Sequence, residues 1–345
     1  MTMMRKAIVA AVAAGLCSVA QAQDKHEVKV AAFVGAQHFM SKWLVGWGEK
    51  LEKASNGRLV FKHFPGASMG PVPAHYDLAA SGRAEVSWFL HGGTPGRFPL
   101  TELTHLPYVA GSAEIGTKTI NDPQLRSKYL DPEHKGVKVL LLLTHQPGNI
   151  NTTKKPVRTT EDIRGMRIRP SSPTVGSFIT ALGGTPVGIS PADQLDALQK
   201  GTLDGTFIDY GGAGIAFKMG GTIKHVTEMY SYVSSFGVVM NPAFYNRLPA
   251  DLKKMVDDSV KGVEKEVGMG WDALDDVGKK LLVDGGAQPI RLSSAEDAKF
   301  RKTAAEVTEA RLKELEGKGL PARQAFALIK SLSEKYAKDS RNFWN

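Results

Sequence analysis

The chain has 345 residues, a formal net charge of +9 and a single cysteine. One cysteine excludes an internal disulfide scaffold, and the basic residues are dispersed, whereas a nucleic-acid footprint would cluster them on one face. We therefore expect no nucleic-acid partner, and the length suffices for two lobes with separate cores.

The N-terminus has the pattern of a secretory signal. Arg5 and Lys6 precede an uncharged apolar run over residues 7–19, and residues 20–22 (Ala-Gln-Ala) form a small-x-small cleavage site. Such a run is too short to span a membrane as a helix. Residues 1–22 are predicted to be a signal peptide whose removal also removes Cys17, and the mature chain is expected in the periplasm.

The first half of the mature chain alternates short apolar runs with amphipathic segments. Apolar residues recur at helical spacing over 39–54, and an apolar run with β-branched residues precedes them. Strands separated by helices favour α/β packing with mainly parallel pairing. The expected elements are strands over 28–33, 58–64 and 86–90 and helices over 39–54 and 76–80.

The second half opens with a strongly apolar strand expected over 136–144. A short strand over 166–169 stops at Pro170, and Ser172 followed by Pro173 predicts the start of a new helix. The remaining expected elements are a helix ending near 200, a strand over 202–208, a β-like stretch beyond 232, and helices over 249–266, 295–317 and 321–336.

Residues 66–70 (Gly-Ala-Ser-Met-Gly) match the nucleophile elbow of serine hydrolases. That elbow needs a helix that starts directly at the serine, whereas prolines at 65, 71 and 73 indicate a loop around Ser68. No spacing singles out a base or an orienting acid for a triad. We therefore expect no enzymatic activity, and a periplasmic serine hydrolase using Ser68 is the alternative of another class.

Nine histidines raise the question of a metal site. None has the i, i+4 spacing of a helical zinc pair, and no His-Glu-x-x-His motif is present, so we expect neither a metal nor a cofactor. His38, His91 and His145 each follow or end a predicted strand, which is where ligands bind in open α/β sheets. The alternative for each is a solvated loop histidine.

Arg169 ends the short strand directly before the helix capped by Ser172. Strand alternation directs Arg167 and Arg169 to one face and Ile168 to the other. A guanidinium can hold a carboxylate through two parallel hydrogen bonds, and a helix N-terminus adds free N–H groups and a favourable dipole. The geometry indicates an anion site, with a solvated arginine as the alternative.

A series of short phrases runs in order along nearly the whole mature chain. They are Phe-Pro-Gly at 64–66, Arg-Phe-Pro-Leu at 97–100, His-Gln-Pro-Gly at 145–148, Gly-Met-Arg-Ile-Arg at 165–169, Leu-Gly-Gly-Thr-Pro-Val at 182–187, Ala-Leu-Gln-Lys-Gly at 197–201, Asp-Gly at 204–205 and Val-Met-Asn at 239–241. In content and spacing the chain resembles the DctP family, the extracytoplasmic binding subunits of tripartite ATP-independent periplasmic (TRAP) transporters.

The resemblance implies an α/β, two-lobed periplasmic binding protein fold with a ligand cleft between the lobes and a long helix bracing both. We expect lobe I to comprise 23–145 and 234–274, and lobe II to comprise 146–233 and 275–345. The resemblance also implies a monomer that captures a small organic acid and delivers it to the membrane subunits of a TRAP transporter. Delivery to a sensor is an alternative that the sequence leaves open.

The family arginine that pairs with the substrate carboxylate falls on Arg169 by motif match. The other candidate ligand contacts are His91, His145, Phe207, Asp209, Phe33 and Gln37.

Departures from the family pattern bear on the ligand. Phe207 and Ile208 stand where many members have Glu or Asn, and His91 stands where an acidic residue is common. Near the crossing between lobes, where sialate-type members have a second arginine, this chain has His145 and Asn149. The pocket is therefore expected to favour a monocarboxylate with an apolar or aromatic body, with C4-dicarboxylates as rivals. Phe207 would set this preference from the cleft, unless it packs in the core of its lobe.

Overall fold

The computed structural model describes residues 24–345. The expected signal peptide, residues 1–22, and Cys17 lie outside the described residues. Within the described part of the chain, no helix has both the length and the apolar character needed to cross a membrane.

Lobe I is built on a five-stranded sheet with the strand order β2-β1-β3-β10-β4. β1 pairs in parallel with β2 and β3, whereas β10 runs antiparallel to β3 and β4. Valines and leucines of these strands form one core with the apolar face of the first helix. The bounds are β1 His26–Ala32, β2 Leu59–Phe64, β3 Val86–Leu90, β4 Lys138–Thr144 and β10 Ser235–Met240, with α1 Phe39–Ala54, α2 His75–Ala80, α3 Ala113–Asn121, α4 Pro123–Leu125, α7 Pro242–Arg247 and α8 Ala250–Ser259.

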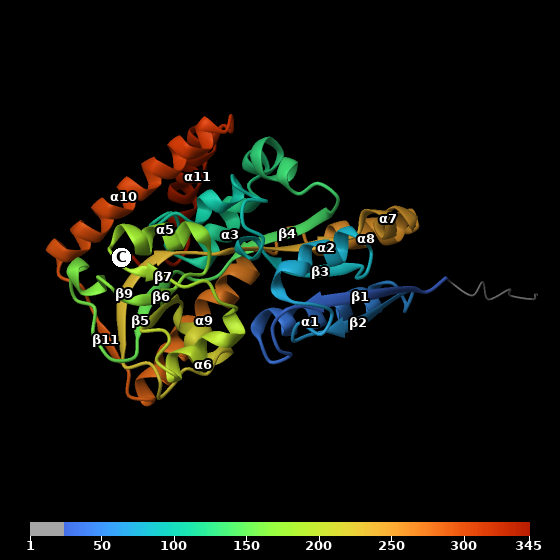
Figure 1. The fold of residues 1–345 in the computed structure, drawn as a ribbon. Helices are drawn as coiled ribbons and strands as arrows, with labels where there is room; N and C mark the ends of the chain where they lie inside the picture. Colours follow the sequence, from blue (N-terminus) through green and yellow to red (C-terminus); the bar gives the residue numbers. More distant parts are fainter. Residues whose placement is uncertain (1–23) are drawn as a thin grey trace, which may run out of the picture.

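Lobe II is built on a six-stranded sheet with the order β11-β9-β5-β8-β6-β7. The strands β6, β7 and β8 run parallel, and β5 is antiparallel to both β8 and β9. Figure 1 shows the two lobes side by side, with β1 to β3 on the right and β5 to β9 on the left. The bounds are β5 Gly148–Thr152, β6 Arg167–Arg169, β7 Thr185–Pro186, β8 Gly205–Ile208, β9 His225–Tyr232 and β11 Gln288–Ile290, with α5 Pro173–Ala181 and α6 Gln194–Gln199.

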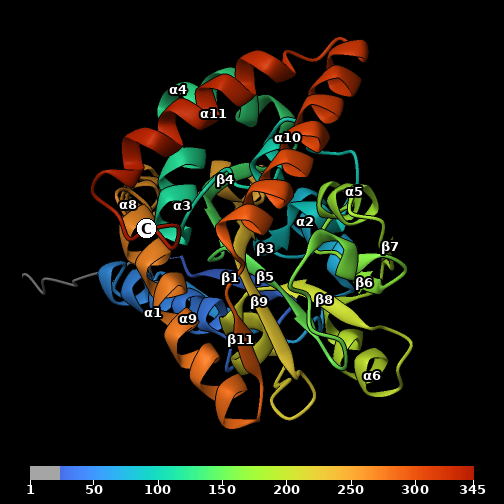
Figure 2. The same ribbon diagram turned by 90° about the vertical axis from the view of Figure 1, so that its left-hand side faces the viewer.

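Several segments in the described part of the chain connect the lobes. The chain crosses from β4 to β5 through residues 145–147 and returns from β9 to β10 through residues 233–234. The long helices α9 (Glu264–Asp284) and α10 (Ser294–Gly317) each contribute to two apolar cores. Figure 2 shows both helices lying across the molecule. The expected two-lobed α/β fold is confirmed, and two long helices, where one was expected, extend over both lobes.

The C-terminal helix α11 (Ala322–Ala337) differs from the expected division of the chain. It falls in a segment assigned to lobe II by sequence, but its apolar face packs with Leu142 of β4 and with leucines of the 100–130 segment. The strands of the first sheet lie within residues 26–144 and 235–240, and those of the second sheet within 148–232 and 288–290. The helix joins lobe I because Ala325, Ile329 and Leu332 find their apolar partners there.

The helix expected over 249–266 is interrupted. α8 ends at Ser259, and Gly262 adopts a left-handed backbone conformation with φ +72° before α9 begins at Glu264. Glycine tolerates this conformation without steric cost, so the chain can change direction there. The interruption turns α9 away from α8 and allows it to extend over both lobes.

Candidate functional site

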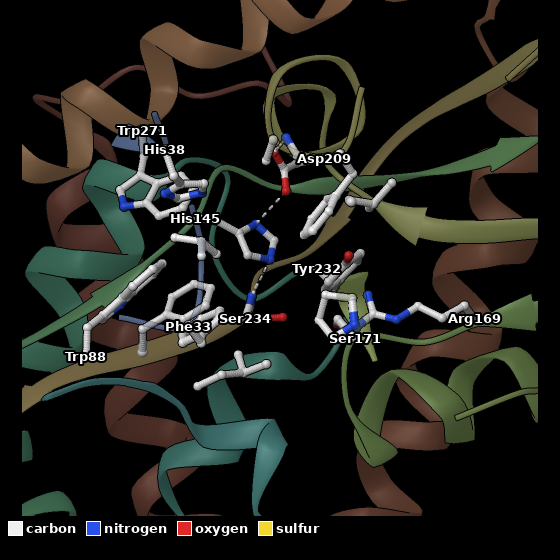
Figure 3. Close-up of a pocket in the computed structure, with 18 residues that line it drawn as sticks. Phe33, His38, Trp88, His145, Arg169, Ser171, Asp209, Tyr232, Ser234 and Trp271 are labelled. Atoms are coloured by element: carbon white, nitrogen blue, oxygen red, sulfur yellow. Dashed lines mark hydrogen bonds and ion pairs between the residues drawn. The ribbon is translucent and has the colours of Figure 1, made fainter. Parts of the chain in front are cut away.

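A cavity lies between the two sheets, where the crossing segments meet. Figure 3 shows aromatic side chains at one end, Arg169 at the other, and His145 and Asp209 between them. The cavity is lined by Phe33, Val34, His38, Trp88, Leu90, His145, Arg169, Ser171, Pro191, Ile208, Asp209, Gly212, Ala216, Phe217, Tyr232, Ser234, Phe236 and Trp271.

One side, which we call the aromatic wall, consists of Phe33, His38, Trp88, Phe236 and Trp271. Phe33 stacks on Trp88 with ring centroids 4.4 Å apart, and Phe236 stacks on Trp271 at 5.8 Å. His38 lies against both tryptophans, at 5.5 Å from Trp88 and 5.2 Å from Trp271. Stacked and edge-on rings of this kind present a flat apolar surface to a ligand ring.

The opposite side, which we call the polar wall, consists of Arg169, Ser171 and Asp209 of lobe II. Arg169 ends β6 and is only 5% exposed. Its Nε has no hydrogen-bond partner, and burial lowers the pKa of its guanidinium. Ser172 caps α5 by accepting the N–H of Val175 at 3.3 Å, so the helix N-terminus lies beside the arginine.

Arg167, two residues earlier on the same strand, has a different environment. Its Nε and Nη2 donate to the two carboxylate oxygens of Asp204 at 3.0 and 2.9 Å, and its side chain is 45% exposed. No carboxylate in the described part of the chain forms such a pair with Arg169. Arg169 is therefore a buried cation that lacks a protein anion and faces a cavity.

His145 lies between the two walls and faces Asp209 of the polar wall. Asp209 Oδ2 is 3.6 Å from His145 Nδ1, and His145 Nε2 accepts the N–H of Ser234 at 3.0 Å. Because Nε2 is an acceptor, the ring proton resides on Nδ1. Burial lowers the pKa of His145, so the ring is neutral. The bond to Ser234 also ties the first crossing segment to the second.

Tyr232 at the end of β9 closes the cavity beside Arg169. Its hydroxyl donates to the backbone oxygen of Phe207 at 2.7 Å, and burial, followed by the charge of Asp209, raises its pKa. The phenol is thus neutral, and its proton is already donated to the backbone oxygen of Phe207.

Four of the candidate ligand contacts meet at this cavity: Arg169, His145, Asp209 and Phe33. His38, singled out from sequence because it follows a strand, lines the cavity as well. Gln37 does not, because it lies exposed in the turn before α1. Its neighbour His38 turns inward instead, since His38 Nδ1 accepts the N–H of Met40 and caps that helix at 3.1 Å.

His91 also lies outside the cavity, contrary to the expectation from sequence. Trp88 and Leu90 of β3 face the cavity, so alternation directs Phe89 and His91 to the other face of the sheet. There His91 is fully buried and its Nε2 is 2.9 Å from His134 Nε2. Burial lowers its pKa well below the usual value, so it is an interior neutral histidine.

Phe207 was expected to face the cleft, but like His91 it lies outside the cavity. Its neighbour Ile208 lines the cavity, and Phe207 points to the opposite face of β8. It is 0% exposed and packs with Ile150, Phe178 and Tyr232 in the core of lobe II. The core alternative weighed in the sequence analysis therefore describes its position.

Sequence reasoning missed much of the cavity, namely Trp88, Ser171, Tyr232, Phe236 and Trp271. Alternation along β3 could have paired Trp88 with Leu90, but no local signal identifies which face of the sheet lines a cleft. Trp271 enters from α9, a helix whose place over the crossing segments depends on the whole fold.

Ser68 lies away from this site. It is exposed in the turn that follows β2 and does not line the cavity. Among residues 24–345, no group of three or more His, Cys, Asp or Glu side chains is arranged to hold a metal ion.

Two lobes joined by crossing strands, with a cavity between them that carries a buried arginine, define a solute-binding protein of the periplasmic type. The model of the bacterial extracellular solute-binding proteins, family 7 (DctP), matches residues 30–314, and the chain belongs to this family. The relationship to TRAP binding subunits expected from the sequence is confirmed. Proteins of this family bind solutes for transport.

Solved structures of TRAP solute-binding proteins share the fold over nearly their full length. One from Rhodoferax ferrireducens, in complex with copurified benzoate, has 27% sequence identity and a TM-score of 0.86, covering 91% of this chain and 99% of that one. A marine metagenome protein specific for aromatic acid ligands, with 3-hydroxybenzoate, has 27% identity, a TM-score of 0.87 and the same coverage. Among curated relatives, the uncharacterized protein YiiZ of Salmonella typhimurium is 23% identical over 257 residues, 74% of each chain.

Proposed function

We propose that this protein captures a small aromatic monocarboxylate in the periplasm and delivers it, as a monomer, to the membrane subunits of a TRAP transporter. The observation that carries the proposal is Arg169, a buried cation without a protein anion at a cavity whose opposite wall is aromatic. Arg169 would bind the carboxylate, and the aromatic wall would contact the ring.

The energetics of Arg169 support a ligand anion. A buried charge without a partner costs several kcal/mol, and a carboxylate with two parallel hydrogen bonds offsets that cost. Arg169 contributes the only arginine or lysine side chain that lines the cavity within residues 24–345. The site thus suits one carboxylate.

The aromatic wall favours a ring as the rest of the ligand. Phe33 and Trp88 stack at an interplanar angle of 21°, and Phe236 and Trp271 at 9°, so both pairs offer ring faces and edges. The copurified benzoate of the Rhodoferax protein and the aromatic acid specificity of the metagenome protein support the same ligand class.

C4-dicarboxylates are the rival ligands. Their second carboxylate would meet either the aromatic wall or Asp209, a carboxylate that is 4% exposed. Neither compensates a buried negative charge. A hydrolase acting through Ser68 has no support from the cavity, because Ser68 is exposed in a turn outside it.

Isothermal titration of the purified mature protein tests the proposal. Benzoate, phenylacetate, succinate and malate are titrated under identical conditions, after removal of copurified ligand by partial unfolding and refolding. We expect benzoate or phenylacetate to bind at least about tenfold more tightly than either dicarboxylate. The second carboxylate of succinate or malate must lose its water without gaining a cation in the cavity. A preference for succinate or malate would contradict the proposal.

A further inference from the structure

Asp209 is a buried carboxylate that faces the cavity with few partners. Its Oδ1 accepts the N–H of Gly212 at 2.6 Å. Its Oδ2 lies 3.6 Å from His145 Nδ1, which is too long for a good hydrogen bond. In Figure 3 the carboxylate points toward His145 in the middle of the cavity. One of its two oxygens therefore has unused capacity to accept a hydrogen bond.

The neighbours of Asp209 do not neutralise its charge. His145 is its only ion-pairing contact within residues 24–345, and the acceptor role of His145 Nε2 toward Ser234 leaves that ring neutral. His145 Nδ1 also donates its proton to the backbone oxygen of Gln146. Asp209 thus shares one proton donor with a competing acceptor.

Gly212 keeps the space beside this carboxylate open. A Cβ at position 212 would lie 3.0 Å from Asp209 Oδ2 and 2.9 Å from the side chain of Ile208. Gly212 itself lines the cavity. Any side chain there would crowd the free oxygen of Asp209, whereas glycine leaves it accessible to a ligand atom.

A carboxylate at this place would repel a bound organic acid unless the acid brings a hydrogen-bond donor to it. We propose that Asp209 accepts a hydrogen bond from a hydroxyl group on the ligand, so that the protein selects hydroxylated aromatic acids over the unsubstituted ones. A hydroxyl offers one donor for the one free oxygen, whereas an ammonium needs three acceptors. The inference rests on the proposed function and specifies its ligand class.

A series of matched benzoates tests this role. Benzoate, the three hydroxybenzoate isomers and the three corresponding methoxybenzoates are titrated into the wild-type protein by calorimetry. We expect at least one hydroxy isomer to bind about tenfold more tightly than benzoate, since a hydrogen bond to a charged acceptor is being added. The matching methoxy compound, which has no donor, should show no gain.

The Asp209→Asn variant assigns the effect to this side chain. The amide oxygen of Asn can still accept the N–H of Gly212, so the turn is retained, but the second atom becomes a donor. The advantage of the hydroxy isomer should disappear. Asp204→Asn is the matched control, because it removes one negative charge from the same lobe outside the cavity and should leave the ratio unchanged.

Three outcomes would overturn the inference. A hydroxyl advantage that persists in Asp209→Asn and that the matching methoxy compound does not share would show that another group accepts the bond. Equal binding of benzoate and every hydroxy isomer to the wild-type protein, a result that needs no variant to fold, would overturn this inference alone. Failure of all these aromatic acids to bind would overturn it together with the proposed function.

Discussion

The two walls of the cavity differ in chemistry and come from different lobes. The aromatic wall belongs to lobe I and α9, and it offers stacked rings such as Phe33 on Trp88. The polar wall belongs to lobe II and offers Arg169, Ser171 and Asp209. A ligand with a charged end and a ring would contact both lobes, so its binding favours the closed arrangement. The contrast shows how two lobes can divide the recognition of charge from the recognition of shape.

The largest expected effect comes from removing the charge of the polar wall. Arg169→Ala should weaken benzoate binding by about 30-fold or more, since losing a buried carboxylate partner costs about 2 to 5 kcal/mol. Arg169→Lys should also bind poorly, because a point charge cannot reproduce the planar fork. Calorimetric titration measures both.

Arg167→Ala is the matched control for that experiment. It removes an arginine from the same strand, but one that pairs with Asp204 outside the cavity. Its affinity for benzoate should equal that of the wild-type protein. Equal losses of benzoate affinity in the two variants would mean that the net positive charge of the protein, and not the position of Arg169, determines binding.

A smaller effect is expected at the aromatic wall. Phe33→Ala removes a half-buried ring that stacks on Trp88, and it should weaken benzoate by about tenfold through lost apolar and ring contacts. Phe61→Ala is the control, because Phe61 is also half-buried in lobe I but packs on Trp47 away from the cavity. Similar affinities for these two variants would argue against the aromatic wall as a ligand contact.

His38 connects the aromatic wall to the pH dependence of stability. Burial lowers the pKa of His38 from 6.5 to about 4, so the folded protein keeps this ring neutral. As the pH falls from 6.5 to about 4, the unfolded chain gains a proton that the folded chain does not, and stability is lost. His38→Asn retains a side-chain acceptor at the N-cap of α1 and removes the titratable imidazole.

Urea unfolding across that pH range measures the difference. The free energy of unfolding should fall less steeply toward acid pH for His38→Asn than for the wild-type protein. Parallel pH profiles for the two proteins would contradict the assignment of His38 as a buried neutral histidine.

The smallest expected effect on binding is at Phe207, which lies behind the polar wall. Phe207→Leu should lower the free energy of unfolding by about 1 kcal/mol and leave affinity unchanged, because the side chain packs in the core of lobe II. Chemical denaturation and titration of the same sample distinguish the two roles. Weaker binding without a loss of stability would contradict the core role and indicate that Phe207 contacts the ligand.

Much of the fold could be predicted from local patterns. The bounds of α1 and β3 agree with the sequence prediction, and α5 begins after Ser172 as its cap and Pro173 indicate. These elements carry their signals within a few residues.

α9 was not predicted as a long helix, because its glycines disfavour helix locally. A Cβ at Gly278 would lie 2.1 Å from the backbone oxygen of Tyr210, so tight packing requires glycine there.

The site was less predictable than the fold. Arg169 could be found because a strand end, a capped helix and a family motif coincide at one position. His91 was assigned to the site because it ends a strand, and Phe207 because alternation allowed it to face the cleft. Alternation defines two faces of a strand without telling which one faces the cleft. Trp271 could not be predicted as a cavity residue. It lies 233 positions after His38 in the sequence, and the two rings come into contact only in the folded protein.

A crystal structure of the protein with bound benzoate tests the division between the two walls most directly. We predict both carboxylate oxygens within hydrogen-bonding distance of the Arg169 guanidinium, with the ring in contact with Phe33 and Trp88. A benzoate whose carboxylate points toward the aromatic wall, or whose ring lies against lobe II without contacting Arg169, would contradict it.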